Sequence, residues 1–597
     1  MTKIKTLLWC ALAAALAAGA APEEQAVEPA AAAGPPARYA YFEVHGYLRE
    51  SLPAVYLFET EGETLHDLLG RMDRVRADEN VQGLILKVGS FEAGWAKIQE
   101  IRRALNGCRA EGKDVICYLQ GAGNRSYYLA TGAGRIVSAP TGHLMLVGLR
   151  AEAIFAKGLL DKIGASADFV QAGKYKTAGE TLTRTEPSPA FRESIESMLR
   201  DYHHQLLAGI AEGRGIAVSA ADELVRGGPY TAQQALEAGA LDGVMFYDEL
   251  LADVRERHGG RLVVESDYGK EAGAQPLKSG PFSFFSLLMG GGTPRRPETS
   301  GPSVAVLHAT GPILTGDSEG IGFGEDVVGA DSFVKVVRKA AADDNIKAIV
   351  LRVDSPGGSA LACDTIWREL RLADEKKPVI ASLSDVAASG GYYIASGARK
   401  IVAEPGALTG SIGVVAGKLV LGGVFEKLGL NVAVFDQGGN AGMMSTLSRF
   451  SDEERGRLRQ LVLRTYHIFL SRVAETRPDM AVADVDKVAQ GRVWTARQAA
   501  ERGLIDALGG LGEAVAAARE AAGIPPDQAV QIVHLPRSRS LVEVMLFGKE
   551  GDAQMPDLWN AAATLAVPRP VRAYLIGLLP LQREIVTCTM PAAVTIR

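Results

Sequence analysis

The sequence predicts an α/β protein that contains two copies of one domain. Short apolar runs rich in β-branched residues alternate with longer stretches of helical period, which is typical of β-α units around a parallel sheet. The same succession returns 265 residues further along the chain, the separation between Asp78 and Asp343. An internal duplication of an α/β domain explains both observations.

The duplication is visible residue by residue. The stretch DENVQGLILKV at 78–88 aligns with DDNIKAIVLRV at 343–353, and the same shift places the tyrosine pair at 127–128 on the pair at 392–393. This period is far longer than that of a solenoid repeat, so each copy is expected to be a whole domain. From the N-terminus we expect an export signal or membrane anchor at 1–24, an Ala/Pro-rich linker at 25–37, the first α/β domain at 38–300, the second at 301–560 and a C-terminal tail of unknown role at 561–597.

The elements expected in each copy follow from their apolar patterns. Runs of five to eight β-branched or apolar residues predict strands, and longer stretches of period 3.6 predict helices. Late in each copy a long helix has a clear start: Ser451 and Glu454 form a capping box, and Ser188 precedes Pro189 at the first helical position. In chain order we expect a strand (40–44; 304–308), a second strand (81–88; 346–353), a helix (94–108; 360–374), a third strand (115–119; 379–383) and a helix with the paired tyrosines.

Composition excludes several classes of protein. With 47% hydrophobic and 22% charged residues the chain is globular and not disordered. Its net charge of −6 provides no overall field that would attract nucleic acid. The 5 cysteines show no CxxC spacing, so neither a zinc site nor a disulfide framework is indicated.

The N-terminus indicates an export pathway. Lys3 and Lys5 precede an apolar stretch from Thr6 to Ala21, which is typical of an export signal. The stretch is shorter than the roughly 20 residues that span a bilayer without tilt. A cleaved signal and a retained anchor are both compatible with it.

The two copies differ at positions where chemistry could take place. After its second strand the second copy has DSPGGS at 354–359, where the first has GSFEAG; backbone N–H groups of a Gly-Gly turn can point at a developing negative charge. The second copy also has AASGGY at 387–392, which places Ser389 at a strand-to-helix turn. The shift aligns Asn124 with Ser389, and an asparagine cannot be the nucleophile. The alternative is that Ser389 only caps the helix.

A nucleophilic serine needs a base. None of the 9 histidines accompanies the motif, and the pairs Tyr202-His203 and Tyr466-His467 recur in both copies, which favours packing. Lys176, in the first-copy stretch GKYKTA, aligns with Ala441, so the copy without the serine has this lysine. A solvated surface lysine is the ordinary alternative. As a base, the lysine would need burial to lower its pKa from about 10.4.

These motifs, together with LTGSIG at 408–413 and TARQAAERGLID at 495–506, closely resemble the signal peptide peptidase A (protease IV) family in its long, two-domain form. The resemblance covers about 38–550. It implies two tandem Clp-protease/crotonase-like domains and a serine endopeptidase of cleaved signal peptides and other apolar peptides. It further implies a homotetramer at the periplasmic face of the bacterial inner membrane, with no metal or other cofactor and no nucleic acid. The site residues that it implies are Ser389 as nucleophile, Lys176 as base, Gly357, Gly358 and Gly390 in the oxyanion hole, and Ser411 as the residue that orients the lysine.

Two other functions share this fold. A crotonase-like acyl-CoA enzyme would use the same glycines on a thioester enolate, although an export signal argues against a cytoplasmic cofactor. A non-catalytic membrane-associated scaffold would need Ser389 and Lys176 both to be structural. The apolar runs at 282–289 and 542–547 are expected to contact a membrane or another subunit, or else to be buried strands.

Overall fold

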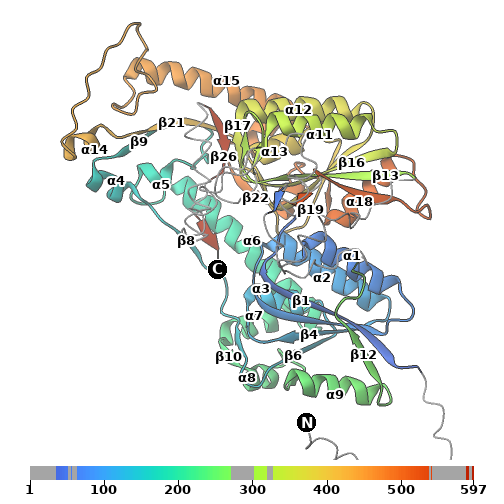
Figure 1. Ribbon diagram of the computed structural model, residues 1–597. Coiled ribbons are helices and arrows are strands. Elements are labelled where there is room, and N and C mark those ends of the chain that lie inside the picture. Colours follow the sequence, from blue (N-terminus) through green and yellow to red (C-terminus); the bar gives the residue numbers. More distant parts are fainter. Residues whose placement is uncertain are drawn as a thin grey trace, which may run out of the picture.

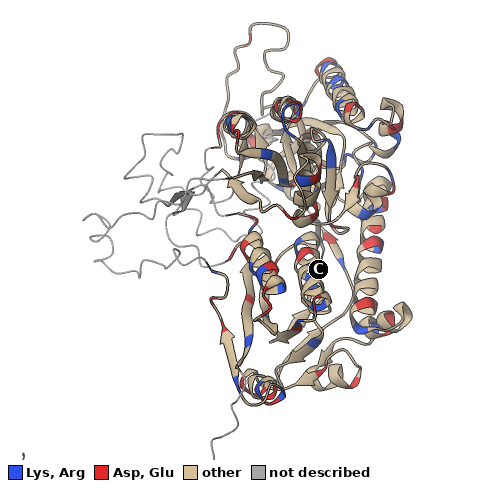
Figure 2. Ribbon diagram, turned by 90° about the vertical axis from the view of Figure 1, so that its right-hand side faces the viewer, with Lys and Arg blue, Asp and Glu red and all other residues tan. Residues whose placement is uncertain are grey.

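The computed structural model describes residues 35–51, 55–56, 63–270, 301–318, 327–536, 539–540, 586–590 and 594–596 (Figure 1). The predicted export segment, most of the linker and the apolar runs at 282–289 and 542–547 lie outside the described residues. Within the described ranges, no helix is both long and apolar enough to cross a membrane. Both signs of charge are interspersed over both halves, as the near-neutral net charge leads one to expect (Figure 2).

The first copy is built around a parallel sheet. Its strand order is β11-β6-β4-β3-β1-β12, and a smaller sheet has the order β10-β7-β5. The strands are β1 (Ala37–Tyr47), β3 (Gly83–Glu92), β4 (Asp114–Leu119), β5 (Ala122–Gly123), β6 (Arg135–Ser138), β7 (His143–Met145), β10 (Tyr230–Thr231), β11 (Gly243–Val244) and β12 (Leu262–Glu265). The helices are α1 (Leu65–Ala77), α2 (Trp95–Ala110), α3 (Asn124–Ala130), α4 (Lys157–Ile163), α5 (Glu180–Thr183), α6 (Pro189–Arg214), α7 (Val218–Gly227), α8 (Ala232–Glu237) and α9 (Tyr247–Arg257).

The second copy repeats this plan. Its main sheet has the order β22-β20-β18-β16-β13-β24, with β19 and β23 continuing from β18. The strands are β13 (Ser303–Thr310), β16 (Ile346–Ser355), β18 (Val379–Ala388), β19 (Lys400–Ala403), β20 (Leu408–Gly410), β22 (Val493–Thr495), β23 (Ala507–Leu508) and β24 (Gln531–Leu535). The helices are α11 (Ala330–Ala342), α12 (Ala360–Asp374), α13 (Gly390–Ala395), α14 (Gly422–Lys427), α15 (Asp452–Thr476), α16 (Val482–Val488), α17 (Ala496–Ala500) and α18 (Leu511–Ala521).

The elements expected from the apolar patterns are confirmed, with ends that differ by a few residues. The β-branched run of β16 is buried along nearly its whole length because helices cover both faces of a parallel sheet. The long helices start where their caps predict: Ser451 and Glu454 form the capping box of α15, and Ser188 caps α6 ahead of Pro189.

A third sheet joins the two copies. Its order is β15-β14-β17-β26-β21-β9, from β9 (Ser166–Ala172), β14 (Ile313–Leu314), β15 (Val328–Gly329), β17 (Gly357–Ser359), β21 (Val414–Val420) and β26 (Thr587–Thr589). The first-copy strand β9 pairs antiparallel with β21 of the second copy, from Ala172 opposite Val414 to Ser166 opposite Val420. The ribbon of β9 and β21 projects from the body beside α4 and α14 (Figure 1). The first copy therefore contributes strand β9 to a sheet of the second copy, and the two copies are not separate globules.

Buried charges also connect the halves. The guanidinium of Arg352 on β16, 1% exposed, donates to both oxygens of Glu50 at 2.9 Å and to Glu100 on α2 at 2.6 Å. Lys97 on α2 lies 2.8 Å from the carboxylate of Asp354, at the end of β16. Since the partners come from opposite copies, these ion pairs fix the position of α2 against the second sheet.

Candidate active site

Ser389 lies between β18 and α13, as the strand-to-helix motif predicts. Its backbone has φ 56° and ψ −113°, a strained conformation for a residue with a side chain. The amide of Ser389 donates to the carbonyl of Gly410 at 2.7 Å, and its carbonyl accepts from Tyr393 at 2.8 Å. These bonds hold the turn, so the hydroxyl is presented at the N-terminus of α13.

Lys176 reaches this serine from the other copy. It follows β9, whose pairing with β21 carries it into the second half of the molecule. Its Nζ lies 2.6 Å from Ser389 Oγ, 2.9 Å from the carbonyl oxygen of Ser411 and 3.0 Å from Ser411 Oγ. A neutral amine has two N–H donors and one lone pair, so it can donate to both Ser411 oxygens and accept from the Ser389 hydroxyl.

Burial sets the protonation of this lysine. Lys176, Ser389 and Ser411 are each 0% exposed. Desolvation lowers the pKa of Lys176 to about 7, and only the electrostatic interactions with Cys588 and Cys363 oppose that shift. A substantial fraction of the amine is therefore neutral at neutral pH, as a general base requires.

The three predicted glycines lie close together beside Ser389. The Gly357 amide donates to Ser355 Oγ at 3.1 Å. Gly390 is the first residue of α13, where an amide has no partner within the helix. A Cβ built on Gly390 would stand 2.9 Å from the Gly358 nitrogen, so these two amides lie close together and a side chain at 390 would crowd them.

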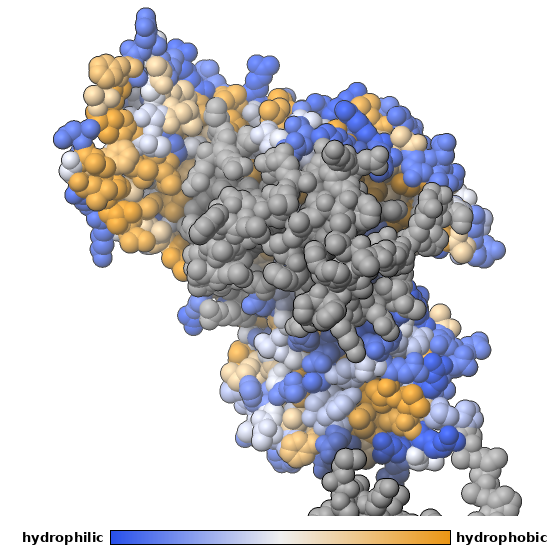
Figure 3. Space-filling view, viewed as in Figure 1, coloured by the Kyte–Doolittle hydropathy of each residue, from blue (hydrophilic) through white to orange (hydrophobic). Residues whose placement is uncertain are grey.

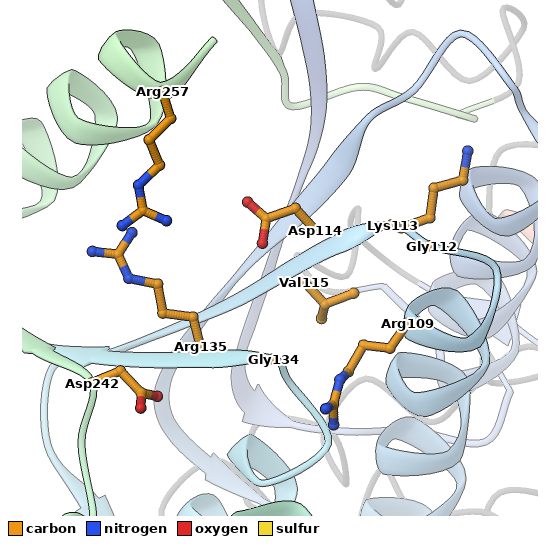
Figure 4. Close-up of a pocket in the computed structure, with 9 residues that line it drawn as sticks. All are labelled: Arg109, Gly112, Lys113, Asp114, Val115, Gly134, Arg135, Asp242 and Arg257. Atoms are coloured by element: carbon orange, nitrogen blue, oxygen red, sulfur yellow. The ribbon is translucent and has the colours of Figure 1, made fainter.

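An open pocket lies elsewhere, on the first copy. It has a volume of about 530 Å³ and lies at the start of β4 and β6, lined by residues that include Arg109, Asp114, Arg135 and Arg257 (Figure 4). Ser389 follows a strand of the other copy. The pocket is polar and contains none of the residues around Ser389.

Comparison with known proteins establishes the family. The profile of peptidase family S49 matches two regions of the chain, residues 108–260 and 371–525. The chain belongs to family S49. Its two matched regions correspond to the two copies of the duplication, and this S49 chain is a serine peptidase with tandem Clp-protease/crotonase-like domains. The acyl-CoA enzyme and the scaffold are thereby set aside.

Relatives of this S49 peptidase match over most of its length. It is 34% identical over 489 residues to "Serine protease SPPA, chloroplastic" of Arabidopsis thaliana, an alignment that covers 81% of this chain and 70% of that one. It is 31% identical over 472 residues to "Protease 4" of Salmonella typhi, covering 77% and 72%. A solved structure of a mutant "1510-N membrane-bound stomatin-specific protease" aligns over 40% of this chain and 100% of that chain at 19% identity, but its TM-score of 0.26 supports no argument.

The surroundings of the site contain residues that the sequence did not reveal. The carboxylate of Asp385 accepts from the backbone of Gly94 and Lys97 at the start of α2, and Cys363 lies against the position of a Gly390 side chain. Cys588 and its neighbours form β26 beside the site. None of these residues belongs to a repeated sequence motif or to a motif with a recognisable spacing.

Proposed function

We propose that the protein is a Ser-Lys endopeptidase in which Ser389 is the nucleophile and Lys176 the general base. One observation supports this most directly: a fully buried lysine amine lies 2.6 Å from the hydroxyl of a serine held at a strained helix N-terminus. Both the distance and the lowered pKa suit proton transfer at neutral pH.

Each step has a group to perform it. Lys176 takes the hydroxyl proton as Ser389 Oγ attacks the peptide carbonyl, and the amides of Gly358 and Gly390 stabilise the oxyanion. The lysine ammonium then protonates the leaving amine, while Ser411 keeps Nζ in place through its carbonyl and hydroxyl. Water resolves the acyl-enzyme with Lys176 again as base. The steps need only residues of this chain.

The substrates in this proposal are cleaved signal peptides and similar apolar peptides, at the periplasmic face of the bacterial inner membrane. The export-type N-terminus supports this location, and the relatives named as proteases support a peptide substrate. An exposed apolar surface over α4, α14 and the adjoining ribbon also suits a membrane or another subunit (Figure 3). Its large exposed residues include Ile154, Leu159, Leu428, Leu430, Val432, Val434 and Phe435.

The proposed homotetramer would form through a strand pairing between chains that repeats the β9–β21 pairing within one chain. By the duplication, β21 corresponds to β8 (Ala151–Ala153) and β9 corresponds to residues 431–437. Among the described residues, β21 has two neighbouring strands, β26 and β9, whereas β8 has one, β27 (Val594–Ile596). Residues 431–437 are exposed and outside any strand. They can pair with β8 of a second copy, and we propose that the rotation of this head-to-tail contact closes into a ring of four.

The substitution Phe435→Asp should therefore dissociate the assembly. Phe435 is 92% exposed in the single chain, and a carboxylate there would be buried against β8 of the next copy. Light scattering should give four chains for the wild type and one for the variant, and Ile154→Asp should act in the same way from the other side. Phe246→Asp, at a distant exposed phenylalanine, is the matched control. An unchanged mass for Phe435→Asp would refute this contact.

The catalytic proposal is tested by covalent labelling. A phosphonate or fluorophosphonate reagent should attach to Ser389 in the wild type, and peptide mapping by mass spectrometry locates the adduct. Ser389→Ala should remain unlabelled, whereas Ser384→Ala, at another buried serine of β18, should still be labelled. Labelling that persists in Ser389→Ala would assign the nucleophile to another residue.

A further inference from the structure

A turn of the second copy lies directly against the backbone of the proposed base. It consists of residues 490–492, between α16 and β22. The Tyr175 amide donates to the backbone carbonyl of Gln490 at 2.7 Å, and the Lys174 amide donates to Gln490 Oε1 at 3.2 Å. The two residues that precede Lys176 are therefore both bonded to Gln490.

The same turn is bonded to the segment that contains Ser411. Strand β22 pairs antiparallel with β20, and the pairing continues beyond the end of β20. The Ser411 amide donates to the Arg492 carbonyl at 2.7 Å. The Gly491 amide donates to the Ile412 carbonyl, also at 2.7 Å. Since Ser411 holds Lys176 Nζ through its carbonyl and its hydroxyl, one turn connects the base with the residue that orients it.

The turn approaches the lysine as closely as its atoms allow. Gly491 has φ 77°, and a Cβ built on it would stand 2.5 Å from the Lys176 nitrogen and 2.6 Å from both Cα and Cβ of Lys176. These distances are far shorter than the 3.5–4.0 Å or so at which non-bonded carbon atoms pack. A side chain at position 491 would therefore displace Lys176 itself.

Gln490 has a strained backbone that several bonds maintain. Its φ of 52° is uncommon for a residue with a side chain. Its amide donates to the Tyr466 hydroxyl at 3.1 Å, its Nε2 donates to Asp486 Oδ1 at 2.6 Å, and the Tyr466 hydroxyl donates to the same carboxylate oxygen at 2.6 Å. Strain that is maintained in this way beside reacting groups indicates a functional requirement. Here its result is that both oxygens of Gln490 face the segment that ends in the base.

The corresponding turn of the first copy is different. Aligning TAQQALEAGALD at 231–242 with TARQAAERGLID at 495–506 places Arg226 opposite Gln490. Arg226 is exposed, and its guanidinium bonds to Asp222 of its own helix at 2.7 Å. The glutamine thus occurs in the copy that receives the base.

We propose that Gln490 is a positioning residue for the general base, and that the turn 490–492 holds Lys176 Nζ between Ser389 and Ser411 and keeps water away from it. The first copy provides the base, and the second copy determines where the base lies. Gly491 contributes by having no side chain at the point of closest approach. This inference rests on the proposed Ser-Lys function.

The substitution Gly491→Ala tests the contact. The methyl group should displace Lys176, so kcat for an apolar peptide should fall by a factor of about 10² while KM changes by less than about twofold. A displaced amine also takes up water, which raises its pKa, so the midpoint of the kcat/KM profile should move from near 7 to a higher pH. The matched control is Gly503→Ala, with a similar φ of 72° but a nearest atom, Met480 Sδ, at 3.5 Å. It should keep the kcat and the midpoint of the wild type.

A second variant decides the outcome if Gly491→Ala does not fold. Gln490→Gly accepts the same backbone conformation and removes the side-chain bonds to Lys174 and Asp486. It should lower kcat about tenfold, with the same shift of the midpoint to higher pH.

Two results would overturn the positioning role. One is wild-type kcat and midpoint in the folded variants of Gln490 and Gly491. The other is a lower kcat with the midpoint still near 7, which would assign the loss to general damage away from the base. If the wild type itself neither reacts with the phosphonate at Ser389 nor hydrolyses peptide, the Ser-Lys function is refuted instead.

Discussion

Lys176→Ala is expected to lower kcat for an apolar peptide by a factor of about 10³, within the range of a general base. Without the amine, the Ser389 hydroxyl keeps its proton, and the leaving amine has no acid. KM should change little, because Lys176 lies beneath the nucleophile and acts on the Ser389 proton. Steady-state kinetics on the purified full-length variant measures both constants. The control is Lys174→Ala, an exposed lysine two residues away, which should keep wild-type kcat.

The pH profile separates a base from a structural lysine. Because burial lowers the pKa of Lys176 to about 7, kcat/KM should rise with pH through a midpoint near 7 and fall about tenfold per unit on the acidic side. A profile that is flat from pH 5 to 9 would contradict the assignment.

The stability of a Lys176 variant distinguishes loss of the base from loss of activity through misfolding. With a folded pKa near 7 and an unfolded pKa near 10.4, the unfolded chain binds more protons between these values. The contribution of this lysine to stability therefore rises with pH across that window, and at pH 7 its burial is unfavourable. Lys176→Met should be inactive and yet more stable than the wild type at pH 7, by on the order of 2 kcal/mol in denaturant unfolding. A destabilised Met variant would argue against a buried neutral amine.

Arg352→Met should destabilise the chain by about 3–5 kcal/mol, the usual cost of removing one partner from a buried ion cluster. Burial alone would raise the pKa of Glu50, but the charges of Arg352 and Lys97 lower this pKa to about 2. Without the guanidinium, Glu50 and Glu100 would be two carboxylates in a closed space, 5% and 4% exposed. Urea unfolding of the full-length variant measures the loss.

A surface ion pair provides the matched control for this prediction. Arg338 bonds to Glu369 at 2.8 Å, but its side chain is 66% exposed. Arg338→Met should therefore change the unfolding free energy by less than about 1 kcal/mol. If both variants lost equal stability, the buried cluster would not be a main connection between the halves. Restoration of stability by adding Glu50→Gln and Glu100→Gln to Arg352→Met would confirm that uncompensated charge is the cause.

The duplication made much of the architecture predictable. Two aligned copies of each strand and helix reinforce one weak apolar pattern with another, so β16, α12 and β18 could be placed to within a few residues. The same alignment isolated Ser389 and Lys176, because a core residue is kept in both copies and these two are not.

The parts that escaped prediction depend on contacts between distant segments. The apolar pattern of β9 predicts a strand. The pattern does not specify whether this strand pairs within its own copy or, as it does, with the other copy. Strand β26 has three residues, two of them threonine, which is too short an apolar pattern to predict a strand. The Ser355 hydroxyl that engages the Gly357 amide is a local bond within the turn, and such a bond is visible only in three dimensions.

The pairing of β9 with β21 of the other copy has a consequence for the newly made chain. Until β9 pairs with β21, Lys176 is hydrated, its pKa is the ordinary 10.4 or so, and it holds its proton. A chain still being synthesised thus contains the serine but lacks a base that can activate it. In the proposed mechanism, folding is then itself the activation step, and an incomplete molecule cannot attack the unfolded chains around it.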